Sequence, residues 1–306
     1  MARVSTGVLT GGSPYLAVGE GPPLVVVQEL TATHEVPSGI ERRLTLSHVA
    51  PLSSAFRVFV VNRKHGLTPG ESMADIAGHL ATGIEAEFGG PVLLTGASTG
   101  GSVALQLAVD RPDLVQALVM VASAYRLGPL GQQVTRDLVR LTRQGDFAAG
   151  WAKIGLEDSL PAPLRGLALP LFRLLARPMT PDNPTDMQVT LQAEEAFNVG
   201  HRLDRVRAPT LVIGGAKDPF YPRELLEQTA ARSRTAGRTS TPAGDMSAPP
   251  GPPQPRTSHS ASCSQPCTPE LTEHRAHAMP SRRPGPRQRP TMAPLEGRSS
   301  ALERRR

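Results

Sequence analysis

Residues 95–101, TGASTGG, constrain the fold of this chain more than any other segment. The apolar run 91–94 precedes them, and residues 102–109 follow with the composition and apolar spacing of a helix. The segment is therefore expected to join a buried strand to a helix through a sharp turn, with Ser98 at its apex.

Gly96 and Gly100 stand two residues on either side of Ser98 and complete the pattern G-x-S-x-G. Between a strand and a helix this pattern is typical of a nucleophile elbow, in which a strained turn exposes the serine and small neighbours let the two arms pass closely. Serine beside glycine also occurs in ordinary turns. The strand before the turn and the helix after it favour the elbow.

Apolar runs and amphipathic stretches alternate along the first 123 residues. The run LVVV at 24–27 is continuous, as in a strand buried on both faces of a parallel sheet. Residues 14–18 are expected to form a neighbouring strand, joined to it by a turn. Further strands are expected at 56–61 and 114–122, and helices at 40–55 and 72–88, the second capped by Ser72. The alternation predicts an α/β fold, a mostly parallel sheet with helices on both faces.

The rhythm changes over residues 124–200, where apolar residues recur at helical spacing and several prolines interrupt them. Strand signals return at 210–213, TLVI, and a helix is expected at 223–231. We therefore predict a core in two parts, 1–123 and 201–233, with a helical insertion at 124–200 between them.

Residues 234–306 differ in composition from the rest of the chain. Thirteen of the 31 prolines and 13 of the 33 basic residues lie beyond residue 231, with only 5 acidic residues. We predict a disordered, basic, proline- and arginine-rich tail. The net charge of +6 comes from this tail, so the composition does not indicate nucleic acid as a partner of the whole protein.

Other composition signals predict a cytoplasmic protein without a metal or cofactor. No apolar stretch is long enough to cross a membrane, and the first residues lack the apolar centre of a signal peptide. The two cysteines, Cys263 and Cys267, both fall in the tail and define neither a disulfide framework nor a zinc site.

A catalytic serine needs a base to take its proton and a third group to orient that base. In parallel sheets such partners lie on loops beyond the carboxyl ends of later strands. Asp218 stands in the loop that follows the predicted strand 210–213. The alternative is an ordinary loop aspartate in a turn before Pro219.

Four features in this order resemble the α/β-hydrolase superfamily of serine hydrolases over roughly residues 14–231: the GASTGG turn, the segment DRPDLVQALVMV, the helical insertion, and APTLVIGGAKDPFYP. The resemblance implies Ser98 as nucleophile, Asp218 as the acid, and an oxyanion hole built from the backbone N–H groups of Thr99 and Leu30. It also implies a helical cap, no cofactor, and hydrolysis of a small-molecule ester, thioester or related acyl bond through an acyl-enzyme.

This chain departs from the family pattern at two places. A glycine commonly lies beside the second oxyanion donor, where this chain has Gln28 and Glu29. The family also places an apolar strand, a glycine and a histidine after the acid, and residues 231–245 contain no such strand and no histidine. The catalytic histidine is therefore unassigned, which predicts impaired activity. Histidines outside the expected position include His34 and His65 on loops that are candidates for substrate contact, His201 before the acid, and His259, His274 and His277 in the tail.

Two hypotheses follow from the missing histidine. A shift of reading frame near residues 238–246 would explain it, because codon degeneracy allows the alternative frame to encode a strand ending in Pro-Gly-x-Gly-His. The 30 arginines and 3 lysines indicate GC-rich DNA, in which wrong frames stay open. If the chain exists as written, the sheet is expected to lack its last strand, and the alternative function is a non-catalytic hydrolase-fold protein that binds a small apolar ligand.

Overall fold

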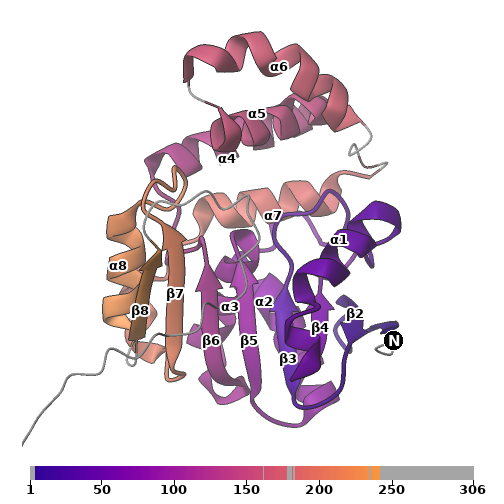
Figure 1. The fold of residues 1–306 in the computed structure, drawn as a ribbon, viewed down its shortest axis with the longest axis vertical. Helices are drawn as coiled ribbons and strands as arrows, with labels where there is room; N and C mark the ends of the chain where they lie inside the picture. The colour runs from indigo at the N-terminus through magenta and orange to yellow at the C-terminus, as the bar shows by residue number, and fades with distance from the viewer. Residues whose placement is uncertain (1–3, 161, 178–180, 182, 234–235, 242–306) are drawn as a thin grey trace, which may run out of the picture. The chain divides into compact units, whose positions relative to one another are not determined.

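In the computed structural model the described residues form one sheet of eight strands in the order β1-β2-β4-β3-β5-β6-β7-β8 (Figure 1). The structure describes residues 4–160, 162–177, 181, 183–233 and 236–241. Strand β2 pairs antiparallel with β1 and with β4, and every other pairing is parallel. The strands are β1 (Val4–Val8), β2 (Pro14–Val18), β3 (Pro23–Val27), β4 (Arg57–Val61), β5 (Val92–Ala97), β6 (Val115–Val121), β7 (Thr210–Gly215) and β8 (Ala236–Thr241).

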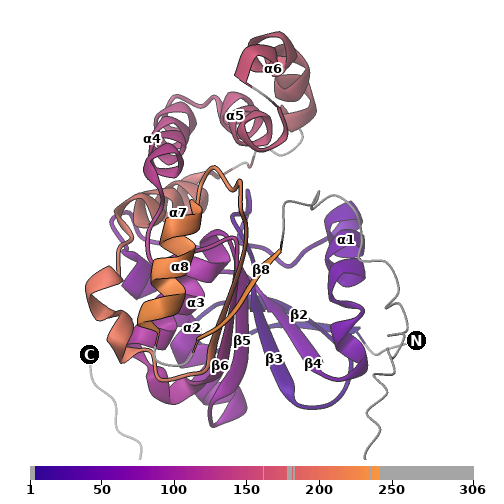
Figure 2. The ribbon, with the colours of Figure 1, turned by 60° about the vertical axis from the view of Figure 1, so that its left-hand side comes forward.

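Helices cover both faces of this sheet. Figure 2 shows α1 on one side and α2, α3 and α8 on the other. The main hydrophobic core lies where β3 to β6 pack against α2 and α3. The predicted fold class, a mostly parallel sheet with helices on both faces, is confirmed. These helices are α1 (Gly39–Val49), α2 (Met73–Phe88), α3 (Thr99–Asp110) and α8 (Arg223–Arg232), with short 3-10 turns at Leu52–Ser54, Pro112–Leu114 and Gly200–Arg205.

Helix α2 shows how the local sequence sets the ends of an element. The Ser72 side chain accepts a hydrogen bond from the backbone N–H of Asp75, whose carboxylate accepts one from the N–H of Ser72. This reciprocal capping box satisfies two N–H groups that the first turn leaves without helical partners. At the other end Gly89 adopts a left-handed conformation with φ of 63°. The helix therefore runs over the residues that the sequence predicts.

The predicted adjacency of residues 14–18 and 24–27 is wrong. Both segments form strands, but β4 lies between them, antiparallel to β2 and parallel to β3. The turn signal between two apolar runs indicates a reversal of direction, but not which strand will occupy the adjacent position. Strand β1, which pairs with β2, has no predicted counterpart, because its residues are mostly half-buried and show no apolar alternation.

The expectation that the sheet lacks its last strand is also wrong. Strand β8 pairs in parallel with β7 along its whole length, from Ala236 opposite Thr210 to Thr241 opposite Gly215. The hydrogen bonds of such a ladder join backbone groups, so an edge strand can form without an apolar run to announce it. The predicted tail lies, apart from β8, outside the described residues.

Between β6 and β7 the described residues form the helices of the insertion: α4 (Pro129–Arg143), α5 (Phe147–Ser159), α6 (Ala162–Ala176) and α7 (Thr185–Ala196). Figure 1 shows them at one end of the sheet, the end at which β7 leads into the loop before α8. Pro170 lies inside α6 and does not end it.

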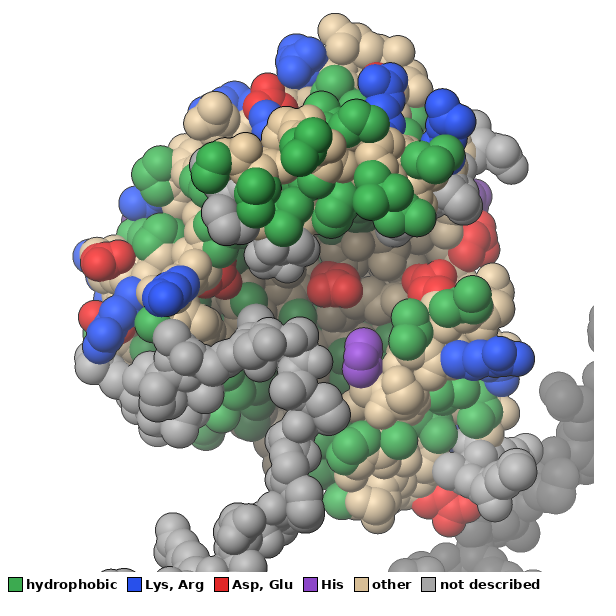
Figure 3. All heavy atoms as spheres, turned by 45° about the horizontal axis from the view of Figure 1, so that its top comes forward, with side chains coloured by type: hydrophobic (Ala, Val, Ile, Leu, Met, Phe, Trp, Pro, Cys, Tyr) green, Lys and Arg blue, Asp and Glu red, His purple; other side chains and the backbone are tan. Residues whose placement is uncertain are grey.

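Two apolar surfaces of the helical insertion differ in their exposure. Side chains of α4, α5 and α7 form a hydrophobic cluster of their own that includes Leu138, Phe147 and Met187. Helix α6, by contrast, leaves six leucines exposed, and Figure 3 shows hydrophobic side chains gathered on this part of the molecule.

No helix within the described residues is long and apolar enough to span a bilayer.

Candidate active site

Ser98 occupies a strained turn between β5 and α3. Its backbone has φ of 49° and ψ of −126°, and Ala122 is the only other non-glycine residue described with positive φ. Left-handed φ is costly for a residue with a Cβ atom. The turn is held because the N–H of Ser98 donates to the carbonyl of Val121 at 3.0 Å, while the Ser98 carbonyl accepts from Gly101 at 2.8 Å.

Three glycines around this turn lie where the chain passes close to other backbone. A Cβ at Gly96 would lie 2.3 Å from the carbonyl oxygen of Gly100. A Cβ at Gly100 would lie 2.3 Å from the carbonyl oxygen of Val27 and 2.6 Å from that of Gln28. At Gly101 it would lie 2.5 Å from the side chain of Ser123. The sequence TGASTGG therefore lets α3 begin directly against the end of β3.

Ser98 opens into a cavity of about 250 Å³ between the sheet and the helical insertion. Its walls come from the turn after β5, the loops after β3, β6 and β7, and helices α4, α5 and α7. Figure 3 shows a hollow beneath the helical insertion with acidic side chains in it. The lining residues are Glu29, Leu30, Ser98, Thr99, Leu127, Val134, Thr135, Leu138, Trp151, Ile154, Leu191, Glu194, Phe220 and Tyr221.

A buried arginine fixes the loop after β3, which contains Leu30, the predicted second donor of the oxyanion hole. Arg63 donates to the carbonyls of Gln28 and Glu29, both at 2.9 Å, and to the hydroxyl of Thr31 at 2.9 Å. Burial lowers the pKa of Arg63 to about 10, although nearby carboxylates oppose this shift. The guanidinium thus holds the backbone on either side of Leu30, at the point where this chain has no glycine.

Asp218 lies in the loop after β7, half-buried, and its carboxylate caps the following turn. Its Oδ1 accepts hydrogen bonds from the N–H groups of Phe220 and Tyr221, both at 2.8 Å, and its own N–H donates to the carbonyl of Gly215. These contacts match the turn role that the sequence allows as an alternative. They also fix Phe220 and Tyr221 where both side chains line the cavity.

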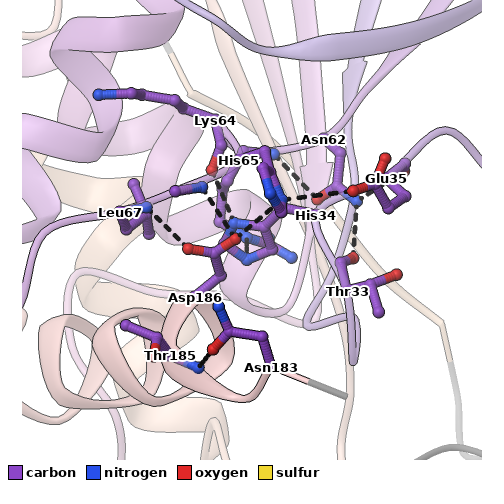
Figure 4. A network of polar contacts seen from close by, with 12 residues as sticks. Thr33, His34, Glu35, Asn62, Lys64, His65, Leu67, Asn183, Thr185 and Asp186 are labelled. Atoms are coloured by element: carbon purple, nitrogen blue, oxygen red, sulfur yellow. Dashed lines mark hydrogen bonds and ion pairs between the residues drawn. The ribbon is translucent and has the colours of Figure 1, made fainter. Parts of the chain in front are cut away.

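His34 and His65 both lie near the junction of α7 with the loop after β4, as Figure 4 shows, but neither lines the cavity. The His34 ring is fully buried, with Nδ1 at 2.9 Å from the carbonyl of Lys64 and Nε2 at 3.1 Å from the Arg63 guanidinium. Burial, and then the charge of Arg63, lower the pKa of His34 to about 3. His34 is therefore a neutral hydrogen-bonding partner in the interior.

His65 and Asp186 complete this junction (Figure 4). Asp186, in the first turn of α7, accepts from the N–H groups of Gly66 at 3.0 Å and Leu67 at 2.7 Å. The exposed His65 ring lies 3.2 Å from Asp186 and 3.3 Å from Glu35. These bonds tie the helical insertion to the loop after β4.

No histidine within the described part of the chain lines the cavity that Ser98 opens into. His201 is exposed in the 3-10 turn before β7. The histidines of the predicted tail, His259, His274 and His277, lie outside the described residues.

Glu194 and Tyr221 line the cavity, and neither is among the site residues predicted from the sequence. Glu194 Oε1 accepts from the hydroxyl of Ser102 at 2.8 Å and from that of Tyr221 at 3.1 Å. Burial raises the pKa of Glu194 to about 7, and burial with the nearby Glu194 charge raises that of Tyr221 well above its usual value. The only sequence signal for Glu194 is a glutamate at an inward position of a helix. No pattern in the sequence predicts that α7 packs against α3.

Comparisons with known proteins bear on the identity of this fold. The family model for the alpha/beta hydrolase family matches residues 41–260. The enol-lactonase from Burkholderia xenovorans LB400 superposes with a TM-score of 0.61 at 18% identity, covering 78% of this chain and 91% of the lactonase. A hydrolase from Pseudomonas aeruginosa PA01 gives a TM-score of 0.59 at 20% identity, covering 79% and 91%.

A curated relative is more similar in sequence but is matched over part of its length. The pimeloyl-[acyl-carrier protein] methyl ester esterase of Neisseria meningitidis serogroup B is 30% identical over 181 residues, which is 53% of this chain and 64% of the esterase. The family model, in contrast, covers more than half of the chain and includes the Ser98 turn, the helical insertion and Asp218. The chain therefore belongs to the alpha/beta hydrolase family.

Proposed function

We propose that this chain is a serine hydrolase that cleaves an ester, thioester or related acyl bond through an acyl-enzyme on Ser98. The observation that carries the proposal is the strained Ser98 turn opening into a mainly apolar cavity. Such a turn is stored strain that presents a side chain to a ligand. The relative from Neisseria meningitidis, described as a methyl ester esterase, supports acyl chemistry.

In the proposed reaction Ser98 Oγ attacks the carbonyl carbon of the acyl group, and its proton passes through a base to the leaving group. The backbone N–H groups of Thr99 and Leu30 stabilise the developing oxyanion, and water then releases the acid from the acyl-enzyme. Asp218 orients the base. The helical insertion acts as a cap that covers the acyl group with apolar side chains from α4, α5 and α7.

The base remains unassigned, and we expect slow turnover. Loss of one triad member removes on the order of 10⁴-fold in rate. Glu29 adds a second cost, because an exposed carboxylate on the cavity wall opposes negative charge on the substrate oxygen.

The absence of a histidine among the described lining residues favours a second candidate function, a non-catalytic protein that binds a small apolar ligand in the same cavity. Trp151 lines this cavity and is the sole tryptophan of the chain, so its fluorescence reports binding directly. Catalysis and binding can therefore be measured on the same protein samples, which distinguishes the two functions.

The test labels the full chain with a fluorophosphonate probe and measures turnover of p-nitrophenyl butyrate. We expect labelling and slow turnover that Ser98→Ala abolishes and that Ser54→Ala, at an exposed serine outside the cavity, leaves unchanged. Labelling that survives Ser98→Ala would reject Ser98 as nucleophile. No labelling and no turnover, with apolar ligands still changing Trp151 fluorescence, would establish the second function instead.

A further inference from the structure

Glu194 lines the cavity and has one carboxyl oxygen without a hydrogen-bond partner among the described residues. Its side chain is buried, with 3% of the residue exposed, and Oε1 is occupied by the hydroxyls of Ser102 and Tyr221. Oε2 is also buried and has no hydrogen-bond partner among the described residues. Since about nine in ten buried polar groups in proteins are paired, an unpaired carboxyl oxygen on a residue that lines a cavity points to a ligand.

Leaving this oxygen unpaired is costly. A buried donor or acceptor without a partner has lost its hydrogen bonds to water and gained none in return, and the loss is larger for a charged group. An apolar side chain at position 194 would avoid this cost at Oε2, although it would take from Ser102 and Tyr221 the acceptor that Oε1 provides. A binding role would account for the second carboxyl oxygen, because the substrate itself would complete its hydrogen bonding.

The charge of the cavity indicates which kind of ligand group would do so. Among the described lining residues, Glu29 and Glu194 are charged and both are acidic. The buried cation Arg63 does not line the cavity, and its N–H groups bond to Gln28, Glu29, Thr31 and His34. A carboxylate or phosphate on the ligand would therefore be repelled, whereas a hydrogen-bond donor would be attracted.

The remaining wall limits the donor to one end of an otherwise apolar group. The apolar side chains that line the cavity together with Glu194 are those of Leu127, Val134, Leu138, Ile154, Leu191 and Phe220. A site of this kind discriminates strongly, because a ligand that lacks the donor leaves the buried oxygen unpaired.

We propose that Oε2 of Glu194 accepts a hydrogen bond from an ammonium or hydroxyl group on the apolar chain of the bound substrate. The cavity then selects chains that carry such a donor and rejects chains that end in a carboxylate. The inference rests on the proposed function for its substrate class, an acyl compound, but Glu194 makes a binding contact and takes no part in bond cleavage.

The test measures binding, so that it does not depend on turnover. Trp151 fluorescence is titrated at pH 8 with hexylamine, 1-hexanol and hexanoate in the full-length Ser98→Ala chain, with and without Glu194→Gln. Glutamine keeps an oxygen for Ser102 and Tyr221 but presents an N–H₂ group in place of Oε2. We expect hexylamine to bind most tightly to the parent chain and about tenfold or more weakly to the Gln variant, with 1-hexanol losing less and hexanoate gaining affinity.

Glu195→Gln is the matched control, since Glu195 is the next residue of α7, is half-buried and does not line the cavity. It should leave all three affinities within twofold. Near-UV circular dichroism of each variant establishes that the cavity wall is folded. Equal weakening of all three probes by Glu194→Gln, or no change in any, overturns the proposal. Loss of labelling at Ser98 with the donor preference intact overturns the proposed function and leaves this one standing.

Discussion

At the scale of single residues, Glu194 and Arg63 are the buried charges on which the cavity depends. Each has 3% of its surface exposed. Burial pushes the pKa of Glu194 up and that of Arg63 down, while the charge of each opposes the shift of the other. Glu194 therefore holds its proton to a higher pH in the folded chain than in the unfolded one, and this difference makes stability depend on pH.

Replacing Glu194 by glutamine should remove that dependence. The folded-state pKa of Glu194 is raised from 4.5 to about 7, so between these values the unfolded chain releases a proton that the folded chain keeps. The stability that the wild-type carboxyl contributes is full below pH 4.5 and is lost as pH rises to about 7. The free energy of unfolding of wild type should fall relative to Glu194→Gln by about 3 kcal/mol across this window and stay level above it.

Urea unfolding of both chains between pH 4.5 and pH 8 measures this difference. Buried His34 has the opposite effect, because its pKa is lowered to about 3 and stability is lost as pH falls below its usual value of 6.5. His34 is present in both chains, so its contribution cancels in the comparison. Glu195→Gln serves as control, and its free energy of unfolding should depend on pH as that of wild type does. If the free energy of Glu194→Gln also followed that of wild type, Glu194 would ionise as readily in the folded chain as in the unfolded one.

At the scale of secondary-structure elements, the site depends on how closely α3 approaches β3. The first turn of α3 lies against the carbonyls of Val27 and Gln28, which end β3 and begin the loop that carries Leu30. This approach places the Ser98 turn next to the Leu30 loop. A side chain at Gly100 would separate the two elements that together build the proposed oxyanion hole.

Gly100→Ala should therefore destabilise the fold by about 3 kcal/mol or more, since the new methyl group would meet backbone that cannot move aside. Gly78→Ala is the matched control: Gly78 lies inside α2, and a Cβ there has no atom within 4 Å. It should stabilise the chain by about 0.5–1 kcal/mol, because alanine favours the helix. Thermal unfolding of both variants gives the comparison, and equal midpoints would contradict the close approach.

The same elements show what the sequence could reveal. Local signals suffice for α2, whose cap and stop residues are Ser72 and Gly89, and for the Ser98 turn, whose strand and helix are adjacent in the chain. They fail for β8, which is stabilised by backbone pairing with β7, and for Glu194, whose partner Ser102 is 92 residues away. The insertion of β4 between β2 and β3 likewise depends on crossovers that no short stretch encodes.

At the scale of the whole molecule, charge and core are separated along the chain. Residues 250–306 carry ten arginines and four glutamates, which accounts for the full net charge of +6, so residues 1–249 are neutral overall. All buried residues of the hydrophobic clusters lie between Leu9 and Ala230. Resequencing the gene tests the hypothesis of a shifted frame in the C-terminal part, and an alternative frame without a strand followed by glycine and histidine would remove it.

Truncation after Pro249 should remove the net positive charge and leave the hydrophobic core intact. This cut keeps β8, which a cut at the predicted start of the tail would remove together with its pairing to β7. Because the clusters that form the core remain, we expect the thermal midpoint to change by no more than about 2 °C, an effect of a fraction of a kcal/mol. Fluorophosphonate labelling of Ser98 and the hexylamine affinity should also persist.

Retention of the truncated chain on a cation-exchange or heparin column at pH 7 should be lost, since that chain is close to neutral. The full chain should bind a short DNA duplex weakly, with an affinity that falls steeply as salt is raised, and the truncated chain should not bind it. A truncated chain that unfolds many degrees lower would show that the last 57 residues contribute to the fold, and one that still binds heparin would place the basic surface within residues 1–249.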